Sequence, residues 1–413
     1  MVCIKVPATL CARCKGRKRL CGAPTCPFIQ RFYANIKALV RVKGLNVDGA
    51  TPPTLIVGER GYPHVPVFLG VPPGVYGEGA KVFDDPKGWW GRLSLDEIVE
   101  LRSSMVSGFI RIDVDKGPDA LRDNEVLFAA LSMKPVDSEI VLAKHPIPKL
   151  SFSDKAKPIP PSAPMKSVRI SSNASMHPKV ERVIDDDLPA QKAIVELYRY
   201  GVDIYTVQRA LSLGALGRRK RRKLVPTRWA ITAVDRTISR YLLSTLWGKD
   251  ATFNHSLAFY AEYLGNRFWI FIDSGKYEIH WVEVWHPSTI YTQHASSIIT
   301  VYNKERISGS IEYLDGGFEA AKLPVLEFLS REGKQGKVII IREILPDYYA
   351  PVGNWHIRES IKRALSMGPV AKGLSLREFI DFVRSRSPIA ASIAEEYVTR
   401  LIKTKLLDFF MMK

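Results

Sequence analysis

The chain of 413 residues is long enough for two or three domains, each with a substantial core. Hydrophobic residues make up 46% and charged residues 25%, and no apolar run reaches the roughly 18 residues of a membrane-spanning helix. The first residues do not form a continuous apolar signal segment. We therefore expect an intracellular, cytoplasmic protein with no membrane partner.

The net charge of +18 is concentrated in two segments. Residues 1–50 contain ten Lys or Arg and one acid, and residues 214–240 contain nine and one. Neighbouring cations repel one another, and an anionic partner offsets that repulsion. The pattern favours nucleic acid as the partner. An anionic membrane surface is the weaker alternative, and a solvated loop is the interpretation without function.

All five cysteines lie in the first 26 residues, and four of them follow the spacing Cys-x2-Cys-x6-Cys-x4-Cys. Two short pairs of thiolates can close a tetrahedron around one metal ion. Zinc suits four thiolates best, although an iron–sulfur cluster also uses four cysteines, and an intracellular setting disfavours a disulfide. Because four protein ligands leave no open position, we expect a structural zinc. The predicted ligands are Cys11, Cys14, Cys21 and Cys26.

Helical spacing of apolar residues predicts a helix over residues 28–43. A short buried strand running into a turn follows within residues 52–63, and Arg60 at its end is a candidate anion contact. The pair Ser94 and Glu97 forms a capping box that opens the next helix.

Further along, residues 109–114 alternate as a strand and residues 119–132 have helical spacing. The proline-rich stretch 145–167 is expected to be a connector or surface loop.

An acidic cluster precedes the basic centre. His177, Glu181 and the aspartates at 185–187 are residue types that can hold a divalent ion for phosphodiester hydrolysis. The alternative, which we favour, is that Asp187 caps a helix over residues 189–200 and that the other acids are solvated. No catalytic residue is assigned.

The basic centre at 214–240 contains six consecutive cations followed by Pro226 and Trp229, which indicates an ordered junction leading into a helix over residues 230–246. The candidate phosphate-binding residues are Arg60, Arg218, Arg219, Lys220, Arg221, Arg222, Lys223, Arg228 and Arg236.

Aromatic-rich strands at 268–272 and 277–285 are predicted to form a hairpin around a turn at 273–275. A second pair, 297–302 and 308–314, extends this sheet. Its aromatic residues are more typical of core and cross-strand pairs than of base stacking. The remaining predicted elements are a helix at 324–331, a strand at 338–344, and helices at 355–366, from Ser375, and at 389–405.

The last residues form an apolar turn. Leu406, Phe409 and Phe410 share one face of a helical turn, and exposing such residues is costly unless they dock in a groove. They either pack on the protein's own core or bind a partner. The arrangement resembles the motif by which DNA enzymes bind the sliding clamp (PCNA), although that motif opens with Gln and this chain has Lys403.

Long strings of the chain, together with the early cysteines and this terminus, resemble the archaeal Nre family of DNA repair proteins. The resemblance covers nearly the whole chain. It implies an N-terminal domain, a smaller C-terminal domain, a role in tolerating DNA damage and partnership with the clamp, but no catalytic mechanism. The strings are Ser172–Val180, Gly201–Tyr205, Arg222–Asp235 and Gly353–Glu359.

We therefore expect an α+β protein in which a four-cysteine zinc module is attached to a mixed α/β domain, followed by a smaller α/β domain and a clamp-binding tail. The expected function is a DNA repair or damage-tolerance factor, associated with the nucleoid, that binds DNA through its basic patches and is recruited by PCNA. One alternative is a metal- or arginine-assisted nucleotide or phosphodiester hydrolase, and another is a clamp adaptor without DNA contact. The expected segments are residues 1–30, 31–320, 321–402 and 403–413.

Overall fold

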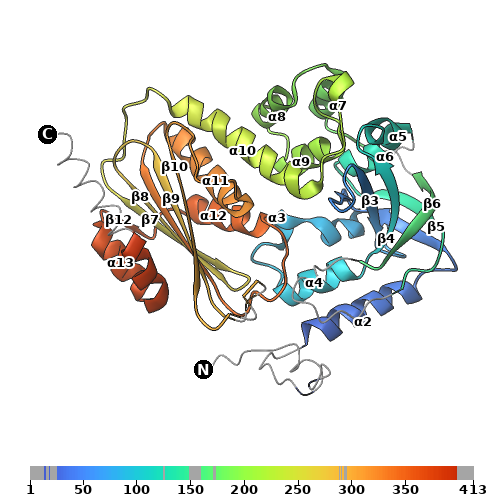
Figure 1. Ribbon diagram of the computed structural model, residues 1–413, viewed down its shortest axis with the longest axis horizontal. Coiled ribbons are helices and arrows are strands. Elements are labelled where there is room, and N and C mark those ends of the chain that lie inside the picture. The colour runs from blue at the N-terminus through green and yellow to red at the C-terminus, as the bar shows by residue number, and fades with distance from the viewer. Residues whose placement is uncertain are drawn as a thin grey trace. The chain divides into compact units, whose positions relative to one another are not determined.

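The structure, a computed structural model, describes residues 14, 18, 26–123, 126–147, 160–170, 174–287, 289, 291–292 and 295–397. The chain divides into two compact units. The first unit comprises residues 11–241 and 350–352, and the second comprises 1–10, 242–349 and 353–413. Each contains a six-stranded sheet and several helices, so the predicted α+β class is confirmed (Figure 1).

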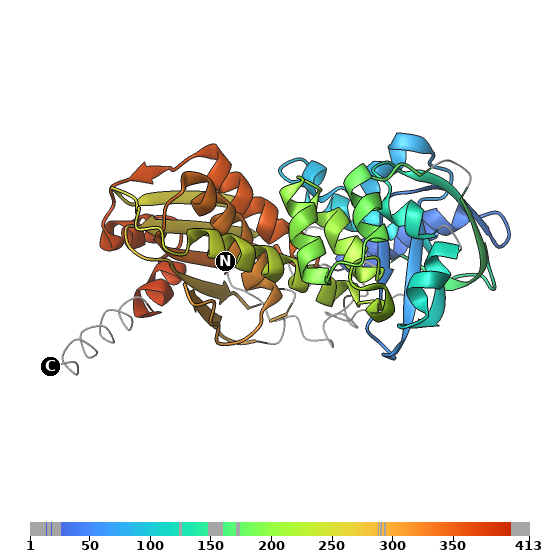
Figure 2. The same ribbon diagram turned by 90° about the horizontal axis from the view of Figure 1, so that it is seen from above.

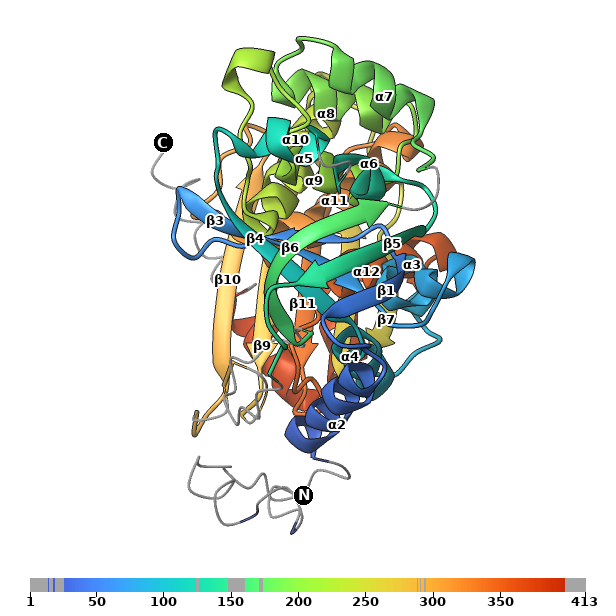
Figure 3. The same ribbon diagram turned by 90° about the vertical axis from the view of Figure 1, so that its right-hand side faces the viewer.

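The sheet of the first unit has the order β1-β5-β6-β4-β3-β2. Neighbouring strands are antiparallel except β4 and β6, which are parallel (Figure 3). The strands are β1 (Asn46–Thr51), β2 (Leu55–Val57), β3 (His64–Val71), β4 (Val106–Asp113), β5 (Val136–Leu142) and β6 (Ser162–Ile170).

This sheet is curled, since β1 contacts β3 although other strands lie between them in the sheet order. Gly49 on β1 permits the approach. A Cβ placed there would lie 2.5 Å from the carbonyl oxygen of Pro72, closer than any side chain tolerates. The absence of a side chain lets Ala50 N–H donate to the Val75 carbonyl at 2.6 Å.

Some helices of this unit pack on the sheet, and α7 to α9 pack on one another. Ser94 and Glu97 make the predicted capping box at the start of α4, with each side chain accepting the other's backbone N–H. Helices α7 to α9 lie together beside α10 (Figure 2, green). The helices are α2 (Pro27–Val40), η1 (Gly77–Asp84), α3 (Pro86–Trp89), α4 (Leu95–Ser103), α5 (Gly117–Asp123), α6 (Val126–Leu131), α7 (Pro178–Asp185), α8 (Ala190–Arg199), α9 (Ile204–Ser212), the single turn η2 (Arg219–Arg221) and α10 (Thr227–Leu246).

The proline-rich stretch 145–167 differs from its prediction, because residues 162–167 belong to β6 inside the sheet. Pro164 lacks an N–H but still contributes its carbonyl, which accepts from Ala143 N–H at 2.7 Å. A shift in strand register near Leu142 accommodates it.

The sheet of the second unit has the order β10-β9-β11-β8-β7-β12. Its central strands are buried along almost their whole length, as expected for a sheet that is covered on both faces. Helix α12 contacts β7 and β8 and packs on α11, while α13 and a helical segment at 388–397 share a core with the strands. The elements are β7 (Leu257–Tyr263), β8 (Asn266–Asp273), β9 (Glu278–Trp285), β10 (Ile299–Arg306), α11 (Gly316–Glu332), β11 (Lys337–Ile344), α12 (Trp355–Met367), β12 (Ala371–Lys372) and α13 (Leu376–Arg384).

The predicted aromatic hairpin is wrong, because β8 and β9 are not neighbours. Strand β11 lies between them, antiparallel to β8 and parallel to β9. The hairpin partner of β8 is β7, joined through Leu264 and Gly265, both of which have positive φ. Residues 308–314 contribute only an isolated bridge from Ile311 to Glu305 instead of a strand.

The expected domain boundary at residue 320 also differs from the structure. It falls inside α11, and β11 beyond it pairs with strands that precede it. The division between the two compact units falls within α10 instead. Among the described residues, no helix is both long enough and apolar enough to cross a membrane.

Candidate nucleic-acid interface

The six consecutive cations form an ordered surface turn in the first unit. Residues 219–221 make the single turn η2, and the residues on either side are extended. Leu224 then anchors the segment: it is 1% exposed, packs on Gly117, and its N–H donates to the Val114 carbonyl at 2.8 Å. The predicted ordered junction between the basic run and α10 is therefore present.

The acidic run at the end of α7 holds this basic turn. The Asp187 carboxylate accepts Arg219 N–H at 2.7 Å, and the Asp186 carbonyl accepts from the Arg222 guanidinium at 2.8 Å. The Arg219 guanidinium also donates to the Asp185 carbonyl. Burial, followed by repulsion from Arg122 and Arg219, lowers the pKa of Arg222 below its usual range.

This arrangement corrects the predicted role of Asp187. The N-cap of α8 is Pro189, with no side-chain hydrogen bond, and Asp187 instead binds the basic turn. His177 caps α7 by accepting Lys179 N–H at 3.2 Å. Within the part of the chain that the structure describes, no three His, Cys, Asp or Glu side chains form a group that can hold a metal.

Of the six cations of the turn, Arg219, Arg222 and Lys223 bind acceptors among the described residues. Lys223 pairs with Asp115 at 2.9 Å, and this hydrogen bond raises the pKa of Lys223. Three others, at positions 218, 220 and 221, are exposed and make no ion pair with any described residue. These three charges are available to an anionic ligand: Arg218, Lys220 and Arg221.

A second cluster lies where α10 begins. Val57 N–H at the end of β2 donates to Thr227 Oγ1 at 2.9 Å, which fixes the loop after β2 against the start of the helix. The rings of Tyr62 and Trp229 then meet at 5.5 Å while remaining 49% and 48% exposed. Exposed aromatic faces beside cations are typical of surfaces on which nucleic-acid bases stack.

The structure brings two predicted phosphate contacts to this cluster. Arg228 forms an ion pair with Glu59 at 3.7 Å, and Arg60 is the next, exposed residue of the same loop. Arg236 lies two turns further along α10 and is half-buried. Sequence reasoning missed Tyr62. Its only local signal was the Tyr-Pro pair next to Arg60, and its ring partner is more than 160 residues away.

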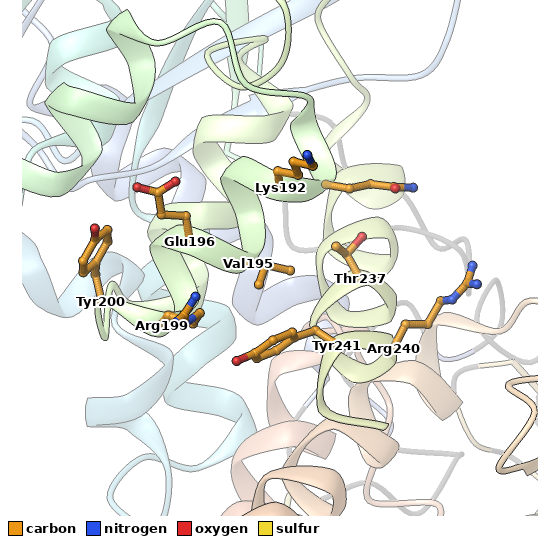
Figure 4. Close-up of a pocket in the computed structure, with 9 residues that line it drawn as sticks. Lys192, Val195, Glu196, Arg199, Tyr200, Thr237, Arg240 and Tyr241 are labelled. Atoms are coloured by element: carbon orange, nitrogen blue, oxygen red, sulfur yellow. The ribbon is translucent and has the colours of Figure 1, made fainter. Parts of the chain in front are cut away.

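An open groove of about 710 Å³ lies between α8 and α10 and was also missed. Figure 4 shows Val195 of α8 across the groove from Thr237 and Tyr241 of α10. The sequence signals for it lie on two separate helices, so only their packing reveals it. The other lining residues are Gln191, Lys192, Glu196, Arg199, Tyr200 and Arg240.

The predicted metal ligands and clamp contacts lie mostly outside the described residues. Cys14 is buried, and Cys26 is half-buried directly before α2. Outside the described residues lie Cys11, Cys21, Lys403, Leu406, Phe409 and Phe410.

The first unit thus presents a cationic surface with exposed aromatic rings on an α+β scaffold, the arrangement of a candidate nucleic-acid-binding protein. The chain matches the archaeal Nre N-terminal family model over residues 20–292 and the archaeal Nre C-terminal model over residues 303–410. It therefore belongs to the archaeal Nre family, which confirms the resemblance seen in the sequence.

Three relatives support this membership. DNA repair protein NreA of Archaeoglobus fulgidus is 36% identical over 364 residues, 87% of this chain and 89% of that protein. DNA repair protein NreB of the same organism is 32% identical, covering 91% of this chain and 93% of that protein. DNA repair protein NreA of Haloferax volcanii is 31% identical, covering 89% and 90%. No solved structure matches the chain significantly.

Proposed function

We propose that this protein is a DNA repair factor that binds DNA through the cationic surface of its first unit. The relatives named as DNA repair proteins support the repair role. The observation that carries the DNA contact is the ordered basic turn, which exposes Arg218, Lys220 and Arg221 without ion-pair partners among the described residues. Folding has already fixed the backbone of this turn, so on binding only the side chains lose conformational freedom.

The test is DNA affinity as a function of salt. Each phosphate contact releases counterions and contributes about 0.9 to the slope of log affinity against log salt concentration. The variant Arg218→Ala/Lys220→Ala/Arg221→Ala should weaken DNA binding for all sequences alike and reduce that slope by about 2 to 3. Fluorescence anisotropy at several salt concentrations measures both quantities.

A matched control removes three exposed cations from the second unit: Lys362→Ala/Lys372→Ala/Arg377→Ala. It should bind DNA as the wild type does. An unchanged slope in the first variant would contradict the proposed contact. Wild-type protein that shows no salt-dependent DNA binding would instead favour an adaptor that recruits other proteins.

We further propose that the four cysteines hold a structural zinc and that the C-terminal tail recruits the sliding clamp, in the cytoplasm and close to the nucleoid. The spacing of Cys11, Cys14, Cys21 and Cys26 supports the zinc site. Metal analysis of purified protein should give about one zinc per chain. Cys11→Ser/Cys14→Ser should lose it, and a metal-free wild type or an iron–sulfur absorption band would contradict the proposal.

A further inference from the structure

The groove between α8 and α10 has a lining that suits a nucleotide. Three of its nine lining residues are cationic, and Glu196 is the one acid among them. Lys192, Arg199 and Arg240 are exposed and form no ion pair with a residue that the structure describes. Such cations concentrate an anion, and Arg in particular offers paired donors to a phosphate.

Two tyrosines supply flat apolar surface at the same place. Tyr241 lies on the groove side of α10, and the edge-to-face contact of its ring with Tyr198, at 6.4 Å, holds it in position. Tyr200 at the end of α8 is 41% exposed, and Lys179 Nζ lies 4.2 Å from the centre of its ring. Rings held in place beside cations bind bases without sequence preference.

The face of α10 connects this groove with the Tyr62–Trp229 pair. Trp229, Ala233, Arg236 and Arg240 are spaced at i, i+4, i+7 and i+11, which places them along one side of the helix. At a rise of 1.5 Å per residue, about 16 Å separate Trp229 from Arg240, enough for a few nucleotides of a strand. The face therefore carries an aromatic residue at one end and a cationic groove at the other.

We propose that the groove binds nucleotides of an unpaired DNA strand that runs along α10 from the Tyr62–Trp229 pair. Phosphates contact Arg199, Arg240 and Lys192, and a base packs against the Tyr241 ring. This inference rests on the proposed DNA binding and assigns it a substrate class. A duplex buries its base faces, so only an unpaired strand can use the tyrosine.

The experiment compares a labelled single-stranded oligonucleotide with the corresponding duplex by fluorescence anisotropy at fixed salt. Tyr241→Leu should weaken binding of the single strand about tenfold and leave the duplex affinity nearly unchanged, whereas Tyr241→Phe should bind both like the wild type. Arg199→Ala/Arg240→Ala should also weaken the single strand more than the duplex. The control Lys81→Ala/Arg92→Ala removes two exposed cations of the same unit outside the groove and should change neither.

The outcomes separate this inference from the function on which it depends. Equal losses for single strand and duplex would overturn it, as would groove variants that bind both like the wild type while the basic-turn variant still loses affinity. In the second case the proposed function stands. Wild-type protein that binds neither DNA would overturn both. Tight binding of free dAMP that Tyr241→Leu abolishes, with strand binding unchanged, would overturn the strand assignment.

Discussion

Arg342 organises the interior of the second unit although its side chain carries a charge. It is 3% exposed, and its guanidinium donates to Asn266 Oδ1 at 2.9 Å and to Glu283 Oε1 at 2.7 Å. Its third partner is His356 Nε2 at 3.1 Å, while His356 Nδ1 lies 2.7 Å from the Gly353 carbonyl. Nε2 must accept from Arg342 and Nδ1 must donate to the carbonyl, so the imidazole is neutral.

This environment predicts a loss of stability in acid. Burial, then repulsion from Arg342, lowers the pKa of His356 to about 3, well below its value in an unfolded chain. Between about pH 6.5 and pH 3 the unfolded state binds one more proton at this site than the folded state. The contribution of neutral His356 to the free energy of unfolding is therefore complete above pH 6.5. It is lost as the pH falls, by up to about 1.4 kcal/mol per pH unit.

His356→Asn removes this titration. The variant should be less stable at pH 7 because Arg342 loses a buried acceptor, and its unfolding free energy should fall less steeply with acidification than that of the wild type. Urea unfolding at pH 4 to 7 measures both effects. The exposed His255→Asn is the control. Equal slopes in wild type and His356→Asn would refute a neutral buried imidazole.

At the scale of the element, the basic turn depends on the acidic run that precedes α8. One carboxylate and two backbone carbonyls at residues 185–187 bind Arg219 and Arg222. These contacts hold in place a segment whose adjacent like charges repel one another. Residues 185–187 thus position the turn whose cations are proposed to bind DNA, and they belong to no group of metal ligands within the described residues.

Asp187→Ala should loosen this turn without unfolding the protein. Because Asp187 is exposed, the loss in global stability should stay below about 1 kcal/mol. Trypsin, which cleaves after Lys and Arg, should cut within residues 218–223 several-fold faster than in the wild type. Limited proteolysis with mass spectrometry measures this. Glu181→Ala, an exposed acid on α7, should behave as the wild type does, and equal cleavage rates in all three proteins would contradict the role of Asp187.

At the scale of the whole molecule, the proposed DNA contacts and the proposed clamp-binding residues occupy different parts of the chain. The described cationic surface lies in the first unit, within residues 59–241, while the apolar residues Leu406, Phe409 and Phe410 are near the C-terminal end of the sequence. If both proposals hold, the two attachments in one chain would raise the effective concentration of the protein at clamp-loaded DNA.

Deleting residues 406–413 tests this separation. The truncated protein should lose clamp binding in surface plasmon resonance and keep its affinity for free DNA, because the apolar plug is removed and every described cation remains. Lys403→Gln, which restores the residue with which clamp motifs open, should bind the clamp at least as tightly as the wild type. Clamp binding that survives the deletion would place the contact elsewhere.

Local elements and family membership follow from the order of residues along the chain. The helix predicted at 355–366 is α12, and the capping boxes at Ser94 and Ser375 open α4 and α13, because periodicity and caps act over a few residues. Pro324 shows the limit: the sequence pattern predicts a helix start there, yet Pro324 lies inside α11, whose N-cap Asp315 accepts the N–H groups of Gly317 and Phe318.

Which distant segments contact one another depends on the packing of the whole fold. Strand β11 lies between β8 and β9. Strands pair through their backbones, so the side chains of β11 do not specify which strands are its neighbours. The contact of Tyr62 with Trp229 and the groove between α8 and α10 likewise join segments that are separate in the sequence. Charge could be counted along the chain, but the binding of the basic turn by Asp187 depends on long-range packing.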